Sequence, residues 1–436
     1  MKTEKGSIID IMKLLYPIRR DLISDGYDEA ISILQKKYPL KLHLYVSGKK
    51  CWTWRIPPKW TLNNAFIADL DDNIIFDMDT SPLFVSSYSN SVNLTLPIGS
   101  LKKHIHVHKE ANYTPYTYNY YNEDFGFNLS EKQLKSLNKS SYKVYIDSNF
   151  TDDFLKVAEW EIKGKTNKTF IIATHLDHAY QANDGLSGVI TGLAVMERLI
   201  QTSNEYTYKL LILPETIGSI AWLSEHEDDI PNIIGGIFLD MTASPLPPYL
   251  QYSYTTNTVT DRSITYAFTQ NTPNGNIVQY RDLKGNDERQ FNAPGVRIPM
   301  LAYAKVLPPN HVDFPFKQYH TLEDNIKNLS FESLFESIRI IYDIVMTFDA
   351  DIIPINLYKG EVFLSGLDFN STEIDKNKDY HNLMKVMDMI DGNNLLSDIA
   401  TKIEVPFILV KNFVDLLISN NLAKQVYPNS QGDDEQ

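Results

Sequence analysis

A buried strand that runs into a polar turn and then into a helix is the feature that most constrains this chain. The strand is an apolar run, Phe170 to Ala173, and it leads into His175-Leu176-Asp177. The turn carries Asn183-Asp184-Gly185-Leu186-Ser187-Gly188, after which a helical pattern begins. A metal site needs an imidazole at a strand end, a carboxylate that holds its second N–H, and an aspartate shared between two ions. His175, Asp177 and Asp184 fit these roles, although an isolated His-x-Asp also occurs as ordinary loop polarity.

Two further apolar stretches downstream end in acidic residues. Lys209 to Leu213 has the pattern of a buried strand and is followed by Pro214-Glu215, and Ile233 to Leu239 is followed by Asp240. Ligands of open α/β sheets bind at the carboxyl ends of the strands, so Glu215 and Asp240 can converge with the first motif although they are distant in sequence. Taken singly, each acid also fits a solvated loop.

A histidine in a polar loop completes the candidate set. The segment Lys317-Gln318-Tyr319-His320-Thr321-Leu322-Glu323-Asp324 precedes an amphipathic helix that we predict over residues 329–348. His320 is a candidate metal ligand. The alternative is a helix-capping loop, because Thr321 and Asp324 are good cap residues.

The order of these motifs resembles the zinc aminopeptidase clan that includes bacterial leucyl-type aminopeptidases and glutaminyl cyclases. The matching elements are His-x-Asp, Asn-Asp-Gly-x-Ser-Gly, Glu, Asp-Met and Tyr-His-Thr within residues 170–325. The flanks, including Trp54 to Trp60 and Asp287 to Phe291, are similar to a subgroup with an inserted β domain and a C-terminal winged helix. The resemblance implies zinc, one or two ions per chain. One ion would be held by His175, Asp184 and Asp240 and the other by Asp184, Glu215 and His320. Asp177 would contact a ligand without binding the metal itself.

The chain departs from the clan at two positions. Members of the clan usually have two adjacent glutamates, a general base and a ligand, where this chain has Pro214-Glu215. Another carboxylate, water activated by the metal alone, or a loss of peptide hydrolysis would each account for this departure. The candidate bases are Glu288 and, if it does not bind metal, Glu215. His178-Ala179 stands where some relatives have His-Pro, so His178 either joins the site or is a solvated loop residue.

Length and hydrophobic patterning predict several domains. The chain of 436 residues is too long for one core, and its hydrophobic fraction of 43% and charged fraction of 22% are ordinary for a globular protein. Helical spacing at the start and alternation from Leu42 to about Val107 predict two helices and then a β-rich segment. The resemblance implies an α/β fold: an α/β/α phosphorylase/hydrolase-like catalytic domain with a mixed sheet, a β-rich insert and a C-terminal winged-helix-like module. The expected boundaries are 1–41 for N-terminal helices of the catalytic domain, 42–125 for the insert, 126–375 for the rest of the catalytic domain, 376–430 for the winged-helix-like module and 431–436 for a disordered tail.

Two clusters in the predicted insert have ambiguous roles. His104, His106 and His108 alternate in the sequence HIHVH, so as a strand they would present three imidazoles on one face. We expect a solvated strand face, with a metal site as the alternative. The aromatic cluster from Tyr113 to Tyr121 is expected to pack in a core or at a domain interface, with a stacking platform as the alternative.

The charge of the chain argues against nucleic-acid binding. The net charge is −14, and residues 381–436 carry four Lys, no Arg and eight Asp or Glu. Duplex binding needs cations that face the phosphates, so we expect the winged-helix-like module to contact protein or to dimerise, and self-association of the chain stays open.

Cys51 is the only cysteine, so no intrachain disulfide can form. The absence of a signal-peptide pattern or a membrane-spanning run leads us to expect a cytoplasmic protein with no membrane partner.

The sequence therefore predicts a metallo-aminopeptidase-like hydrolase that cleaves an amide or peptide bond next to a free amine. The substrate would be a peptide or an aminoacyl amide, and the resemblance places Asp287, Glu288, Arg289 and Gln290 in the pocket. The alternatives are a single-zinc cyclase or acyl-transfer enzyme and a non-catalytic scaffold with a relict metal site. The resemblance also indicates a context in polysaccharide biosynthesis, without naming a substrate.

Overall fold

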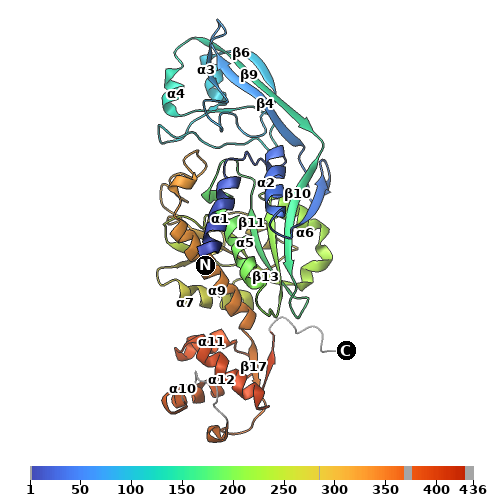
Figure 1. Cartoon of the computed structure of the whole chain (residues 1–436), viewed down its shortest axis with the longest axis vertical. Coiled ribbons are helices and arrows are strands. Elements are labelled where there is room, and N and C mark those ends of the chain that lie inside the picture. Colours follow the sequence, from blue (N-terminus) through green and yellow to red (C-terminus); the bar gives the residue numbers. More distant parts are fainter. Residues whose placement is uncertain (1, 284, 368–375, 428–436) are drawn as a thin grey trace.

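The computed structural model describes residues 2–283, 285–367 and 376–427. The molecule is elongated and has three parts along its long axis (Figure 1). A small β-sheet with short helices lies at one end, a large mixed sheet flanked by helices lies in the middle, and a helical module lies at the other end. The middle part carries the candidate metal ligands.

The large sheet is mixed, and its centre is parallel. β12, β11, β13 and β16 run parallel to one another, whereas β10 and β14 flank them in the antiparallel direction. The four central strands therefore bring their carboxyl ends to one edge, which is where open α/β sheets bind ligands. In spatial order the eight strands are β1 (Lys41–Val46), β10 (Phe154–Ile162), β12 (Thr207–Leu213), β11 (Thr169–His175), β13 (Ile233–Leu239), β16 (Met300–Lys305), β14 (Pro248–Gln251) and β15 (Asn276–Val278).

Helices cover both faces of the large sheet, which gives three layers. All seven residues of β11 are buried, and their side chains alternate between two cores: Phe170 and Ile172 belong to one, Ile171 and Ala173 to the other. Burial on both faces explains why this strand is a continuous apolar run in the sequence. The first core is completed by α1 (Lys2–Leu15), α2 (Asp25–Gln35), α5 (Gly188–Leu199), α7 (Val259–Asn271) and α9 (Phe331–Ala350), and the second by α6 (Ile217–Glu225) and α8 (Glu288–Phe291).

The small sheet packs against the second core and has the order β5-β4-β9-β6. Its strand pairing differs from the predicted insert boundaries, 42–125. β1 belongs to the large sheet through its pairing with β10, and β9 lies beyond residue 125. Alternation in a sequence indicates a strand but not the sheet it joins, because long-range packing selects the partner. The elements of this part are β2 (Lys50–Cys51), β3 (Trp54–Arg55), β4 (Lys59–Ala68), β5 (Ile74–Asp77), β6 (Val92–Pro97), β7 (Ile105–His106), β8 (Phe127–Asn128), β9 (Ser141–Thr151), α3 (Ile98–Leu101) and α4 (Glu131–Ser136).

The histidines of HIHVH do not form one strand face, contrary to the sequence pattern. A helical turn covers Lys102–His104, and β7 has only two residues. The ring of His104 stacks on Phe125 and that of His108 on Tyr113, with centroids 4.0 and 5.5 Å apart. The imidazoles therefore pack separately, and local ring contacts outweigh the tendency of an alternating segment to stay extended.

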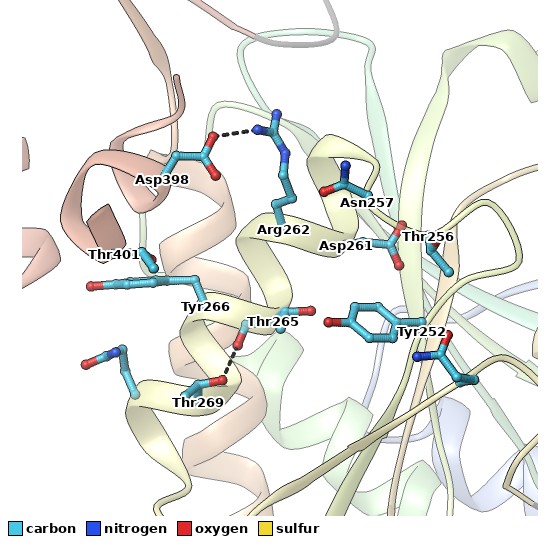
Figure 2. A pocket seen from close by; sticks show the side chains of 12 residues that line it. Tyr252, Thr256, Asn257, Asp261, Arg262, Thr265, Tyr266, Thr269, Asp398 and Thr401 are labelled. Atoms are coloured by element: carbon cyan, nitrogen blue, oxygen red, sulfur yellow. Dashed lines mark hydrogen bonds and ion pairs between the residues drawn. The ribbon is translucent and has the colours of Figure 1, made fainter. Parts of the chain in front are cut away.

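The helical module has a core of its own, and both ring packing and polar contacts join it to the middle part. The ring of Tyr266 on α7 lies 6.0 Å from that of Phe407 in the module. Ile399, Val410 and Phe413 are among its buried residues. Asp398 of this module pairs with Arg262 of α7 at 2.6 Å (Figure 2). The described part of the module expected over 376–430 contains α10 (Lys376–Asp388), α11 (Leu396–Ile403) and α12 (Phe407–Ser419), and β18 (Ala423–Val426) pairs antiparallel with β17 (Ile353–Asn356).

The predicted tail, 431–436, lies outside the described residues. Within the described ranges, no helix has both the length and the apolar character needed to cross a membrane. The predicted helix over 329–348 corresponds to α9, and the two N-terminal helices correspond to α1 and α2.

Candidate metal centre

Three central strands of the large sheet each carry a candidate ligand to the same edge. His175 is the last residue of β11, Asp240 follows β13 directly, and Glu215 lies two positions after β12. β11 is parallel to both other strands, so the three carboxyl ends meet at one edge. The convergence of these side chains is a consequence of sheet topology.

Asp184 lies at the centre of the candidate site. It is 1% exposed and belongs to the turn Asn183–Ser187 between β11 and α5. Its Oδ1 lies 3.4 Å from Nε2 of His175 and 3.2 Å from Nδ1 of His178, and its Oδ2 lies 2.9 Å from Nε2 of His320. Oδ2 of Asp240 lies 3.5 Å from Nε2 of His175. One carboxylate thus faces three imidazoles, an arrangement suited to a group that metal ions share.

The turn at Asp184 requires glycine at the next position. Gly185 has a φ of +85°, and a Cβ atom there would lie 2.8 Å from Cε1 of His175. The N–H of Gly185 donates to Oδ1 of Asp240 at 2.8 Å. Asp324 accepts the backbone N–H of Asp184 at 2.9 Å. These contacts fix the direction of the Asp184 side chain, and Asp324 serves this turn rather than capping the helix that follows it.

His178 joins the site, and Glu215 contacts it. Nε2 of His178 lies 3.2 Å from Oε2 of Glu215. Asp177 accepts the backbone N–H of Glu215 at 2.7 Å, and its Oδ1 lies 3.5 Å from Nδ1 of His175. Asp177 is therefore placed to orient His175, and Glu215 reaches the site through His178.

Arg20 holds the loop that carries these ligands, although no sequence motif marks it. Its side chain is fully buried, and it donates to the carbonyl oxygens of Leu176, His178 and Gln181 at 2.9, 2.8 and 2.9 Å. Burial lowers the pKa of Arg20 to about 10, so the guanidinium stays charged at neutral pH. A basic pair such as Arg19-Arg20 is common on protein surfaces, which is why the sequence does not distinguish this arginine.

The donor set fits a metal ion. Five buried atoms have no hydrogen-bond partner among the described residues: both ring nitrogens of His175, Nδ1 of His178, Nε2 of His320 and Oδ2 of Asp184. Buried polar atoms are nearly always hydrogen bonded, so such a group needs an explanation. Ligand atoms around a tetrahedral zinc ion, with bonds of about 2.0 Å, lie about 3.3 Å apart. The separations here run from 2.9 to 3.5 Å, and one ligand atom from each of His175, His178 and Asp184 lies within 4.8 Å of the others.

The electrostatics of the site also favour a cation. Burial opposes a charged imidazole, yet Asp240, Asp177 and Asp184 together raise the pKa of His175 well above its usual value. Burial and the charge of Asp184 raise the pKa of Asp240. The shifts show a buried cluster of carboxylates that attracts positive charge, which divalent ions would supply.

The site reaches solvent at Glu215 and His320. Their side chains are 21% and 20% exposed, whereas those of His175, Asp184 and Asp240 are 0%, 1% and 3% exposed. A substrate that approaches the centre therefore meets Glu215 and His320 first.

Tyrosines from the small-sheet part border this opening. The ring of Tyr116 lies 5.4 Å from the rings of both His178 and His320. Tyr118 is 43% exposed and stacks on Tyr120 with ring centroids 4.5 Å apart. The aromatic cluster packs between two parts of the molecule, as predicted, and it also forms a wall of the centre.

The predicted substrate-binding residues do not face the centre as a unit. Asp287 is fully buried and accepts the backbone N–H of Thr216 at 2.9 Å, and burial is the main cause that raises its pKa to about 7. Nε of Arg289 donates to the carbonyl oxygen of Asn286 at 2.8 Å. Gln290 lines a separate cavity of about 600 Å³ formed with β3 and α6.

Glu288, the predicted base, does not fit that role in this geometry. It is fully buried, and its carboxylate accepts the N–H of Asn286 at 3.0 Å and Nε2 of Gln251 at 3.4 Å. Burial raises the pKa of Glu288 to about 7. Nδ2 of Asn286 in turn donates to Oδ2 of Asp240 at 3.1 Å. Glu288 therefore lies behind Asp240, because its short helix turns the side chain inward, away from the opening at Glu215.

A second group of potential ligands, His43, Glu159 and His226, lies outside this centre. Nε2 of His43 lies 3.1 Å from Oε2 of Glu159, and Nζ of Lys209 lies 3.2 Å from Oε1. Burial opposes its charge, but His43 and Lys209 lower the pKa of Glu159 to about 2. The ammonium group already supplies the cation and would repel a divalent ion. We assign this group as an ion-pair network.

The layered mixed sheet is similar in fold to solved structures of zinc aminopeptidases. A zinc aminopeptidase from Bacillus subtilis has a TM-score of 0.61 and 15% identity, over 79% of this chain and 94% of that one. The Peptidase M28 precursor of Shewanella amazonensis has a TM-score of 0.54 and 14% identity, over 79% and 94%. At these identities the likeness shows the fold alone.

Residues 9–351 match the family named "Domain of unknown function (DUF4910)", and the chain belongs to this family. A Clostridium acetobutylicum protein named "Putative polysaccharide biosynthesis protein with aminopeptidase-like domain" is 28% identical over 426 residues, which are 97% of this chain and 96% of that protein. A crystal structure of a "putative peptidase" from the same organism has a TM-score of 0.85 and 28% identity, over 97% of this chain and 96% of that one.

Proposed function

We propose that this chain is a zinc-dependent, aminopeptidase-like hydrolase that cleaves an amide or peptide bond next to a free amine. One observation carries the proposal: Asp184 faces three imidazoles at the carboxyl edge of a parallel sheet, and within the described residues the nitrogen that each ring turns toward Asp184 is buried without a hydrogen-bond partner. The aminopeptidase fold of the structural neighbours supports it.

His175, His178, Asp184, Asp240 and His320 would hold the metal, with Asp184 shared if two ions bind. Zinc bound there would act as a Lewis acid on the substrate carbonyl and would lower the pKa of a bound water. Asp177 orients His175, and Glu215 orients His178. This ligand set differs from the one that the resemblance implies, because His178 takes the position expected of Glu215.

Glu215 is the general base in this proposal. Its Oε2 contacts His178, while its side chain is 21% exposed at the opening where substrate and water enter. A base must lie within hydrogen-bond reach of the water that it deprotonates, and the position of Glu215 at the opening supports it over the fully buried Glu288. The carboxylates around the opening would also attract the free amine of the substrate.

The test combines metal analysis with a panel of aminoacyl amides and aminoacyl p-nitroanilides. We expect one or two zinc ions per chain and release of the free amino acid by the zinc-loaded protein. Asp184→Asn should lose both properties because it removes the shared carboxylate. His226→Ala is the matched control: it removes an imidazole from the ion-pair network and should keep both. Zinc binding without turnover of any amide would remove the hydrolase assignment.

A non-catalytic scaffold is the second candidate, and Pro214 favours it because this residue occupies the position of an acidic one in the clan. We also assign a winged-helix-like fold and a protein-contact role to the module over 376–430, since these residues carry six Lys, no Arg and six Asp or Glu and so have no excess of positive charge. A scaffold would keep zinc and its partner contacts but would turn over no amide.

A further inference from the structure

A second cavity lies where the middle part of the molecule meets the helical module (Figure 2). Its volume is about 510 Å³, within the range of about 300–1,000 Å³ for small-molecule sites. Side chains of α7, α11 and the segment after β14 form it. Every one of its twelve lining side chains carries a hydrogen-bonding group, and none is aliphatic. A ligand bound here would therefore meet hydrogen-bonding groups together with the carbon surfaces of the same side chains.

The charged groups of this lining already have partners within the protein. Arg262 pairs with Asp398 at 2.6 Å. Asp261 is fully buried and accepts the N–H and the hydroxyl of Ser253 at 2.9 and 2.7 Å. Phosphate and carboxylate ligands need a free arginine or lysine, and the lining, all of it within the described residues, offers no second cation. The lining therefore does not favour an anion, and because both of its acids are already bonded it offers no free carboxylate to a cation, so the ligand that fits best is uncharged.

The rest of the lining combines aromatic rings with neutral hydrogen-bonding groups. The rings of Tyr252 and Tyr266 lie on either side of Thr265 in the view of Figure 2. Asn257 and Gln270 add exposed amides, and Oγ1 of Thr265 is buried without a hydrogen-bond partner. The face of an aromatic ring is electron-rich and attracts C–H groups, while amides and hydroxyls pair with hydroxyls. A sugar ring presents both a C–H face and an equatorial rim of hydroxyls.

We propose that this cavity binds a neutral oligosaccharide, with sugar rings packed on Tyr252 and Tyr266 and hydroxyls bound by the amide and threonine side chains of the lining. The cavity shares no residue with the metal centre. Binding here is therefore independent of the proposed hydrolase activity, and it would hold the protein on a glycan whatever bond the metal centre cleaves.

The experiment titrates the full-length protein with maltotriose, N,N′,N″-triacetylchitotriose and mannotriose in a calorimeter. We expect at least one of them to bind with a millimolar or lower Kd. Tyr252→Ala should weaken that binding at least about fivefold, because it removes an aromatic platform. Gln270→Ala should weaken it about threefold, since it removes a neutral hydrogen bond worth about 0.5–1.5 kcal/mol, and an exposed helix position tolerates alanine.

Tyr380→Ala is the matched control, because Tyr380 is an exposed tyrosine outside the cavity. Asp184→Asn separates the two sites: sugar binding that survives in this variant supports the proposal. Failure of all three sugars to bind at 10 mM would overturn it. Binding that is lost in Asp184→Asn and unchanged in Tyr252→Ala would also overturn it, since the sugar would then occupy the metal centre.

Discussion

Tyr116 and His320 are joined through their backbones: the N–H of Tyr116 donates to the carbonyl oxygen of His320 at 2.7 Å. Pro115 and Thr321 form a β-bridge beside this bond. The small-sheet part is thereby attached to the loop of a candidate metal ligand. Its tyrosines are held at the opening of the centre, and they are well placed to select the substrate.

Tyr118→Ala should raise the KM for an aminoacyl amide by about 2–10-fold, because an aromatic contact contributes about 0.5–1.5 kcal/mol beyond its buried area. The zinc content should stay the same, since Tyr118 contacts the ring of His320 only at its edge, with centroids 6.3 Å apart. Steady-state kinetics and metal analysis measure both quantities. Tyr121→Ala, which removes an exposed tyrosine of the same cluster, should leave KM unchanged. An unchanged KM in both variants would remove the tyrosines from substrate binding.

Glu215→Gln should lower kcat by about 10²–10⁴-fold, the usual contribution of a general base. The amide keeps the shape of the side chain, so zinc content and KM should change little. Glu288→Gln should retain kcat within a few-fold, because Glu288 is buried away from the opening. The opposite pattern, a large loss of kcat in Glu288→Gln alone, would identify Glu288 as the general base.

Gly185→Ala should weaken zinc binding by at least about 100-fold, the upper range for residues that orient ligands. The new Cβ would press on His175, at 2.8 Å from its Cε1, in a left-handed backbone conformation. Gly295→Ala is a close control: its φ is also +85°, but its Cβ would meet open space. It should cost about 1–2 kcal/mol of stability and no zinc affinity. Competition with a zinc chelator gives both affinities, and equal affinities would contradict the steric argument.

Asp324→Ala should destabilise the fold and weaken zinc binding together. It leaves the N–H groups of Asn183 and Asp184, now bonded at 2.8 and 2.9 Å, buried without an acceptor. Each unsatisfied donor costs about 1–3 kcal/mol. Denaturant unfolding measures the loss, and Glu323→Ala, at the neighbouring acid, provides the comparison. Equal unfolding free energies of the two variants would show that Asp324 does not support the turn.

Asp351 should make the stability of the chain depend on pH. It follows α9 and accepts the N–H of Ser397 at 3.0 Å, and burial raises its pKa from 3.8 to about 6. The folded state therefore favours the neutral acid, so its contribution is lost as pH rises from about 4 to about 6. The loss is about 3 kcal/mol at most, at 1.36 kcal/mol per pKa unit. Asp351→Asn cannot titrate, so its unfolding free energy should rise relative to the parent over this pH range.

Much of the framework could be predicted from local sequence. The runs that become β11, β12 and β13 are apolar because both faces of each strand are buried, and that pattern is visible in the residues themselves. Parallel strands of an α/β sheet share one edge, so His175, Glu215 and Asp240 could be placed together before any coordinates. The helical periods of α1, α2 and α9 were equally visible.

Tertiary structure decided which side chains complete the centre and in which direction they point. His178, Arg20, Asp324 and Tyr116 enter through contacts across 37 to 204 positions of sequence, and no local pattern encodes such distances. Glu288 and Glu215 are both acids that the sequence analysis places near the metal site. The turn of a short helix buries Glu288, whereas Glu215 lies at the opening. The sequence by itself determined the strands, their polar ends and hence the edge of the sheet where a site forms. Only the packing of distant elements decided the orientation of each side chain at that edge, because orientation depends on contacts that the chain makes after it has folded.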